Sequence, residues 1–197
     1  MATVKIKFRP STVEGEIDGK AFKVTQSTNY PFDFSLIFDV ETKAQFTFKI
    51  RVPKWCKDLK VKGCKFKVEK GFIVVEVNGN AKISVEFTAE IEKKRASSGV
   101  YFKRGPLVYC LGMKGERSQW TKHTYEGVDY PFYRMKPDKK WNYAIDVSKA
   151  PKYIAGKDTV WDVDKDLPCI EVSAKEVENW VIKPTHKFKT HSWDYVI

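Results

Sequence analysis

Short stretches of alternating apolar and polar residues fill the first 90 or so residues of the chain, with tight-turn signals between them. Alternation with a period of two is typical of a strand that buries one face. Asp18-Gly19, between two such stretches, is a strong signal for a two-residue hairpin. Many short strands with tight turns and no helix indicate a β-sandwich. The strands predicted here cover residues 3–8, 13–17, 21–25, 34–40, 46–52, 59–61, 65–68, 72–77 and 81–87.

The pattern changes after a charged run at residues 90–95, where the small, polar stretch 96–99 follows. Such a stretch is typical of a domain boundary. We therefore predict an all-β chain of two consecutive antiparallel β-sandwich (jelly-roll-like) domains, residues 1–93 and 94–197. The second contains a long segment, residues 112–140, which we interpret as irregular. Further strands are expected at residues 100–103, 107–111, 141–147, 169–172 and 180–182.

One strand of the second half, residues 107–111, has apolar residues on both faces. We expect it to be covered on both sides. Pro106 suits the first position of a strand, and Gly105 allows a sharp turn before it. Arg104 would then be held at the edge of the sandwich. We expect it to contact a carboxylate or a backbone carbonyl there, and to fasten the segment 112–140 or the domain junction.

The residues from Arg104 through Gly105, Pro106 and Tyr109 to Cys110 also resemble the signature of family 127 of the glycoside hydrolases, the β-L-arabinofuranosidases. Three other stretches resemble motifs of the same family and follow in the family's order. Four motifs in the right order are far more specific than one. The other three are residues 28–33 (Thr-Asn-Tyr-Pro-Phe-Asp), 50–55 (Ile-Arg-Val-Pro-Lys-Trp) and 141–144 (Trp-Asn-Tyr-Ala).

In that family the four motifs belong to the β-sandwich part that follows a catalytic helical barrel. The resemblance covers about residues 11–182 and includes no part of the barrel. It implies a non-catalytic portion of a glycoside hydrolase that packs on the barrel and shapes its active site. It also implies arabinose-containing glycans of the plant type as the parent protein's partners, and a parent that is secreted or periplasmic. Residues 1–7 contain no apolar stretch, so no signal peptide is visible, and the compartment stays open.

The net charge is +11, with 36 Lys and Arg against 25 Asp and Glu. Lysines alternate with apolar residues, as in a half-solvated sheet, and there is no Arg-rich cluster. We therefore expect no nucleic-acid partner. No apolar run is long enough for a membrane helix, and we expect no membrane partner.

Four cysteines and one acidic run are candidates for metal or redox chemistry, and we expect neither a metal nor a cofactor. None of the cysteines stands in a C-x-x-C pair or in the family's zinc-binding motifs. A disulfide between Cys56 and Cys64 is an open alternative, and Cys110 and Cys169 are predicted to be small buried hydrophobes. Residues 162–166 space carboxylates like a calcium loop but lack its glycine and final glutamate, which favours a solvated turn.

No catalytic residue is predicted, because no motif marks a carboxylate pair and the three histidines are scattered. We therefore expect no enzymatic activity from this chain alone. Aromatic residues gather between residues 120 and 141, where Trp120, Tyr125, Tyr130 and Trp141 are candidates for sugar stacking. Rings that fill a core or an inter-domain contact are the alternative. An independent carbohydrate-binding module and a free-standing structural protein are therefore the two other function classes.

Overall fold

The computed structural model describes residues 3–5, 9–96, 99–159, 161–162 and 164–178. All regular structure among these residues is β-strand. The all-β class predicted from the alternation is therefore confirmed. Within the described part of the chain no helix is long and apolar enough to cross a membrane.

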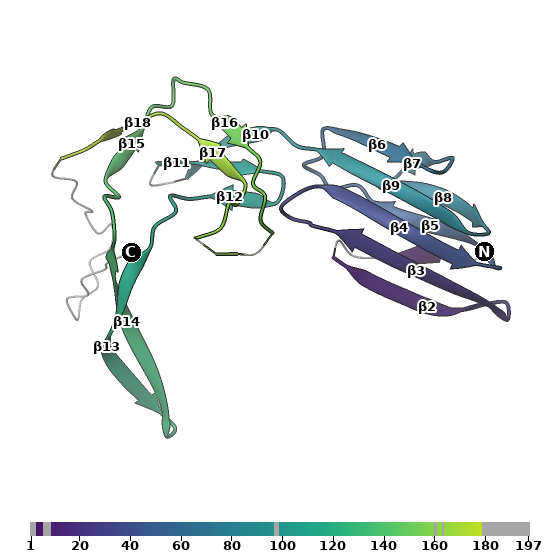
Figure 1. Ribbon diagram of the computed structural model, residues 1–197, viewed down its shortest axis with the longest axis horizontal. Coiled ribbons are helices and arrows are strands. Elements are labelled where there is room, and N and C mark those ends of the chain that lie inside the picture. Colours follow the sequence, from purple (N-terminus) through teal and green to yellow (C-terminus); the bar gives the residue numbers. More distant parts are fainter. Residues whose placement is uncertain (1–2, 6–8, 97–98, 160, 163, 179–197) are drawn as a thin grey trace.

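The first half consists of two sheets that face each other (Figure 1). All strand pairs in them are antiparallel except the parallel pair β1 and β5. The five-stranded sheet has the order β2 (Ser11–Ile17), β3 (Lys20–Thr28), β4 (Ser35–Thr42), β9 (Ala81–Thr88) and β6 (Asp58–Lys62). The four-stranded sheet has the order β1 (Thr3–Lys5), β5 (Gln45–Arg51), β8 (Phe72–Asn78) and β7 (Lys67–Glu69).

The core between the two sheets is built by every second residue of their strands, as the alternation predicted. In β4 these are Leu36, Phe38 and Val40, and the facing sheet supplies Phe48 of β5. The rings of Phe38 and Phe48 meet edge to face with centroids 5.1 Å apart. Burying one such side chain stabilises the fold by about 1.5–3 kcal/mol. The first half therefore has the continuous core of an ordinary sandwich.

The predicted hairpin at Asp18-Gly19 is confirmed, and it joins β2 to β3. Both turn residues have positive φ, 51° and 70°. This is the backbone of a type I′ turn, whose twist matches that of the two strands. Residue pairing runs without a break from Ile17 and Lys20 to Ser11 and Gln26.

The second half contains one three-stranded sheet and three two-stranded sheets. The chain leaves the five-stranded sheet at Thr88 and enters the next one at Ile91, while the polar stretch 96–99 lies between β10 and β11. The division into two domains at residues 93 and 94 stays a prediction. The sheets are β10 (Ile91–Ala96) with β11 (Gly99–Arg104) and β12 (Leu107–Tyr109), β13 (Gly115–Tyr125) with β14 (Val128–Pro137), β15 (Tyr143–Ile145) with β18 (Ala174–Glu176), and β16 (Lys152–Ile154) with β17 (Cys169–Glu171).

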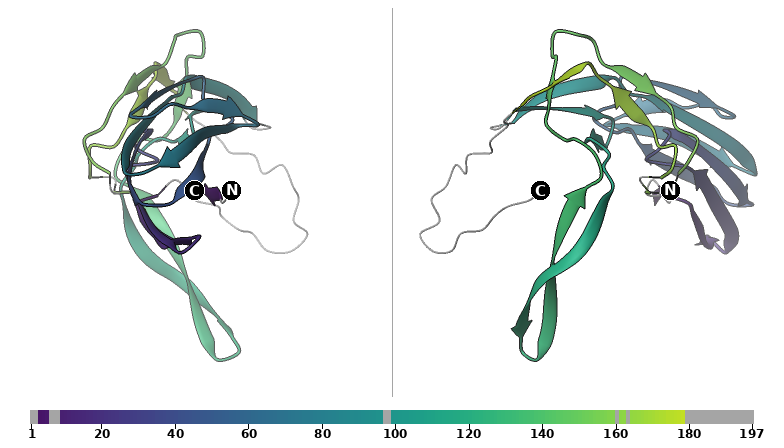
Figure 2. Two further views of the ribbon diagram at one scale, coloured as in Figure 1. Left: turned by 90° about the vertical axis from the view of Figure 1, so that its right-hand side faces the viewer. Right: turned by 60° about the vertical axis from the view of Figure 1, so that its left-hand side comes forward.

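The interpretation of residues 112–140 as irregular is wrong. Residues 115–137 of this segment form the long hairpin β13–β14, which extends away from the other strands (Figures 1 and 2). Glu126 and Gly127 make its turn, with φ of 49° and 78°. The segment was misread because β13 is mostly polar, so no apolar alternation marks that strand. Gly127 between two residue runs of strand length was the signal that could have identified it.

The expectation that residues 107–111 are covered on both faces is also wrong. The strand β12 ends at Tyr109 and lies at the edge of its sheet, and the Val108 side chain is 64% exposed. Cys110 and Cys169 are exposed rather than buried. The physical reason is the same in each case. No second sheet of the described residues covers these faces, so apolar character did not lead to burial.

Ala174–Glu176 forms β18, which pairs with β15 and was not predicted from the sequence. The strand predicted at residues 180–182 lies outside the described residues, as do residues 6–8 of the first predicted strand.

Candidate functional site

Three of the four sequence motifs meet at one phenylalanine, Phe34, at the end of the first sandwich. Its ring centroid lies 6.4 Å from that of Tyr30 in the first motif and 4.7 Å from that of Trp55 in the second. The guanidinium carbon of Arg104, in the third motif, lies 4.8 Å from the same centroid. Three segments that lie far apart in sequence therefore form one cluster, which we call the Phe34 junction (Tyr30, Phe34, Trp55, Arg104 and Gly105).

Arg104 links the two halves of the chain through its guanidinium group. The group lies between Phe34, which precedes β4, and Tyr153 of β16. Its carbon atom is 3.8 Å from the centroid of the Tyr153 ring. A cation over an aromatic face is attracted by the ring quadrupole, and partial burial strengthens the attraction. The contacts that the structure shows for this side chain are therefore with rings, whereas the sequence led us to expect a carboxylate or carbonyl.

Tyr109 lies near Arg104 and has a buried hydroxyl group for which the described residues offer no hydrogen-bond partner. Burial raises the pKa of this hydroxyl to about 12, and the neighbouring Tyr153 also raises it, while Arg104 lowers it. A neutral phenol without a partner cannot act as a base near neutral pH. The surroundings of Tyr109 therefore favour a role for its side chain in packing.

A second aromatic contact also joins the two halves. The ring of Phe32 lies 4.6 Å from that of Trp161, centroid to centroid, at an angle of 46°. Phe32 is buried whereas Trp161 is 67% exposed. Together with the Phe34 junction, this contact joins the end of the sandwich to the second half through aromatic rings.

The hairpin β13–β14 carries the other group of candidate residues. Successive side chains of β14 alternate between its faces, so Val128, Tyr130 and Phe132 share one face. Tyr125 pairs with Val128 on that face, and the strand register shifts at Trp120. Arg134 of the same face lies with its guanidinium carbon 4.6 Å from the centre of the Trp120 ring. We call Trp120, Tyr125, Tyr130 and Phe132 the aromatic face, and all four are exposed.

The opposite face of the hairpin is more polar. Lys122 pairs with Asp129 at 2.6 Å, and the hydroxyl of Thr124 donates a hydrogen bond to the same carboxylate. These two contacts lower the pKa of Asp129. Arg117 lies over the ring of Tyr133, with its guanidinium carbon 3.5 Å from the centroid. The two faces therefore differ in chemistry, and the aromatic one is the candidate for a ligand or partner.

The structure brings three of the four predicted sugar-stacking residues onto one face and leaves out the fourth. Trp141 lies before β15, outside the hairpin. Phe132 takes its place, which the strand register reveals and sequence spacing alone did not. Of the predicted structural residues, Arg104, Gly105 and Tyr109 lie at or beside the Phe34 junction, and Pro106 stands between β11 and β12. Tyr153 was missed, because a lone tyrosine in a three-residue strand has no signal in the sequence.

No group of three metal-ligating side chains is present in the described part of the chain. In the acidic run, the Asp164 N–H donates a hydrogen bond to the Asp162 carboxylate, and Lys114 forms an ion pair with Asp164. All four cysteines are free, and the Cys56 thiol donates to the Asp58 carbonyl. Burial raises the pKa of both Cys56 and Cys64, so these thiols are less reactive than exposed ones.

The solved structures that resemble this chain include three glycoside hydrolases. A GH127 β-L-arabinofuranosidase from Geobacillus stearothermophilus T6 is 20% identical over 68% of this chain and 30% of its own, with a TM-score of 0.49. A second glycoside hydrolase is 16% identical over 82% and 31%, with a TM-score of 0.43. A GH127 β-arabinofuranosidase is 14% identical over 87% and 31%, with a TM-score of 0.44. The matched part is thus about 30% of each of these proteins.

No curated protein matches the chain. Among protein-family models, the one described as "Beta-L-arabinofuranosidase, GH127 middle domain" matches residues 4–91, the two facing sheets of the first half. Two of the four motifs, residues 28–33 and 50–55, lie inside the match. The resemblance to family 127 of the glycoside hydrolases is thereby confirmed, and residues 4–91 match the middle domain of that family.

Proposed function

We propose that this chain is the non-catalytic β-sandwich portion of a family 127-like glycoside hydrolase, and that it packs on a catalytic helical barrel and shapes one side of its active site. The match of residues 4–91 to a middle domain supports an accessory role. The related structures are about three times as long as the part that this chain matches, which leaves room for a separate catalytic unit. On this proposal the parent protein acts on arabinose-containing glycans.

The observation that carries the proposal is the uneven burial of the two halves. Nineteen of the twenty buried hydrophobic residues belong to the first half, and Phe102 is the one among the described residues after Gly99. The exposed large apolar side chains show the reverse distribution, since apart from Ile37, Phe66 and Val68 all of them come after residue 100. Large apolar side chains exposed on a soluble protein often mark a surface that a partner covers. The second half therefore suits a partner that covers it, and the helical barrel is the partner we propose.

The test starts from the open reading frame that surrounds these 197 residues. A frame that also encodes a helical barrel lets the barrel and this chain be produced separately and mixed. We expect the chain alone to leave an aryl β-L-arabinofuranoside intact, and the mixture to hydrolyse it faster than the barrel alone. Turnover by the chain alone, abolished by one acidic substitution within it, would contradict the proposal. So would a frame that contains no barrel.

A carbohydrate-binding module that works by itself is the second candidate, because the aromatic face is exposed on a projecting hairpin. Sugars stack on such rings. Titration with an arabinose-containing oligosaccharide, followed by tryptophan fluorescence, separates the two candidates. Trp120→Ala should abolish binding if the module works alone, whereas Trp161→Ala, at the exposed ring outside the hairpin, is the matched control. If the chain packs on a barrel instead, both variants should bind the sugar as weakly as the parent.

A further inference from the structure

The strand β8 is only half covered at one of its two edges. Along one edge β5 pairs with it over its full length, from Phe72 to Asn78. Along the other edge β7 pairs with Phe72, Ile73 and Val74 only. Within the described residues no strand pairs with the remaining stretch, Val75–Asn78, on that side. A strand edge left open in this way is a template for another extended chain.

The geometry of the neighbouring turn shows which backbone groups point to the open side. Val52 donates its N–H to the Gly71 carbonyl on the β5 side, with N and O 2.8 Å apart. In an antiparallel strand, successive residues direct their N–H and C=O groups to opposite neighbours. Every second residue after Gly71 points the same way, so the N–H and C=O groups of Val75 and Val77 are directed to β5. Glu76 and Asn78 therefore direct their N–H and C=O groups to the open side.

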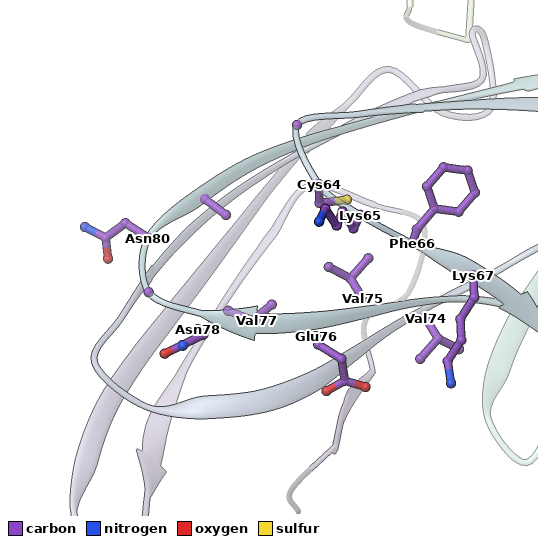
Figure 3. Close-up of a pocket in the computed structure, with 13 residues that line it drawn as sticks. Cys64, Lys65, Phe66, Lys67, Val74, Val75, Glu76, Val77, Asn78 and Asn80 are labelled. Carbon is purple, nitrogen blue, oxygen red and sulfur yellow. The ribbon is translucent and has the colours of Figure 1, made fainter.

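An open slot of about 590 Å³ lies beside this edge, between the end of β8 and residues 63–67 (Figure 3). Gly63, with φ of 88°, lies against the backbone carbonyl of Lys82 in β9, so closely that no Cβ would fit. The connection that follows β6 is therefore fixed on β9 and stands off from β8. Because β8 runs away from the second half, the slot lies far from the strands β10–β18 (Figure 1).

The lining of the slot is apolar with a basic rim. Phe66 lines the slot, and it is one of the three large hydrophobic side chains exposed in the described residues before Gly99. Lys65 and Lys67 line it as well. Glu76 is the one acidic residue of the lining, and its carboxylate accepts the hydroxyl of Thr47, with oxygens 3.1 Å apart. An extended peptide with apolar side chains and carboxylates would match both the surface and its charge.

We propose that this slot binds an extended segment of a partner protein, in which carboxylates alternate with apolar side chains, as an added strand on β8. The N–H and C=O groups of Glu76 and Asn78 would pair with its backbone, which gives affinity. Phe66 would take its apolar side chains, and Lys65 would face its carboxylates, which together give selectivity. This interaction is independent of the function proposed above, because it uses the first half and neither the aromatic face nor the Phe34 junction.

Amide hydrogen exchange of the 197-residue chain tests the backbone part of the proposal. In the free chain the amides of Glu76 and Asn78 should exchange fast, while those of Val75 and Val77, bonded to β5, exchange slowly. The probe is a blocked peptide of about six residues that alternates valine and glutamate, long enough to cover the open edge. Its addition should slow exchange at Glu76 and Asn78 by at least about tenfold. A peptide with N-methyl groups at every second residue should give no such protection.

Two charge variants test the selectivity of the slot. Lys65→Glu should weaken binding of the valine–glutamate peptide by about tenfold or more at low salt. Lys60→Glu on β6 changes the net charge equally but does not line the slot, so it should change affinity by less than about twofold. Equal loss in both variants would overturn the proposal, as would slow exchange of Glu76 and Asn78 in the free chain. Protection that rises with protein concentration and needs no peptide would make a second copy the occupant and would overturn it too.

Discussion

Gly105 lies so close to the ring of Phe34 that a Cβ added to it would stand 2.6 Å from the Cζ atom of that ring. Phe34 precedes β4 in the first sandwich, and Gly105 stands between β11 and β12 in the second half. The backbone of one half therefore touches the core of the other. Gly105 also has a positive φ of 59°, a conformation that glycine adopts without steric cost. Both properties require glycine at this position.

We predict that Gly105→Ala destabilises the protein by about 2–4 kcal/mol, through the unfavourable φ and the clash with Phe34. Gly127→Ala is the matched control, since Gly127 has a φ of 78° but no atom within 4 Å of the added Cβ. The control should lose only about 1 kcal/mol. Urea unfolding of the two variants measures the difference. Equal losses would mean that the contact with Phe34 contributes nothing.

Arg104 should stabilise the same junction through its two ring contacts. We predict that Arg104→Ala lowers the free energy of unfolding by about 1–3 kcal/mol. Arg104→Lys should restore only part, because an ammonium group cannot stack as the planar guanidinium does. Arg95→Ala, at an exposed position of β10, is the control and should change little. If both Arg104 variants melt like the parent while binding of an arabinose-containing glycan falls, the residue belongs to a sugar site instead.

The sequence was sufficient for the first half because there each local signal and the burial agree. Alternation predicted which faces are apolar, and the two sheets then cover each other, so residues such as Phe38 and Phe48 are buried as expected. Asp18-Gly19 set the register of β2 and β3 without any long-range information. The meeting of the motifs at Phe34 was beyond this reasoning, because it depends on contacts between distant segments.

In the second half, the apolar pattern of the sequence did not predict which residues are buried. Val108 and Cys110 were expected to be buried because they are apolar, and both are exposed. Burial is a property of two surfaces, and one strand contains information about only one of them. In the hairpin β13–β14 both faces are uncovered, and β13 is mostly polar, so no buried apolar face marked that strand in the sequence.

Tyr109 leads to a prediction on stability and pH. Because its buried hydroxyl has no partner in the described residues, Tyr109→Phe should cost nothing and gain up to about 1 kcal/mol. In the unfolded chain its pKa returns to the ordinary value of 10, whereas burial holds it at about 12 in the folded chain. Between pH 10 and pH 12 the Tyr109 hydroxyl loses its proton in the unfolded chain but keeps it in the folded chain. The free energy of unfolding therefore falls as the pH rises through 10 towards 12.

Urea titrations at several alkaline pH values measure this effect. The free energy of unfolding of the parent should fall more steeply above pH 10 than that of Tyr109→Phe, and the two should run parallel below pH 9. Tyr125→Phe, at an exposed side chain in the hairpin, is the matched control. A Tyr109→Phe curve parallel to the parent throughout would mean that the Tyr109 hydroxyl is hydrated in the folded protein.

We predict that the acidic run at residues 162–166 binds no calcium at physiological concentration. Asp162 and Asp164 already interact with a backbone N–H and with Lys114, and Lys165 places a cation between the carboxylates. A calcium loop needs six to eight oxygen ligands, including a bidentate glutamate that this run lacks. Isothermal titration with calcium measures this binding directly. Micromolar binding that Asp164→Ala abolishes would contradict the prediction.

Gln26 supplies the last prediction, because it is a polar side chain in the core of the sandwich. Its side chain is 2% exposed, and both its amide nitrogen and its oxygen are buried without a hydrogen-bond partner in the described residues. A buried polar group without a partner costs about 1–3 kcal/mol, since folding removes its hydrogen bonds to water. Gln26→Met has a similar volume and no such requirement, so we predict a gain of about 1–3 kcal/mol in the free energy of unfolding. Gln45→Met, at an exposed position of β5, is the control and should stay within about 0.5 kcal/mol of the parent. Urea unfolding of the parent and the two variants measures these differences in the free energy of unfolding. A loss of stability in Gln26→Met would mean that a water molecule or another partner satisfies the amide.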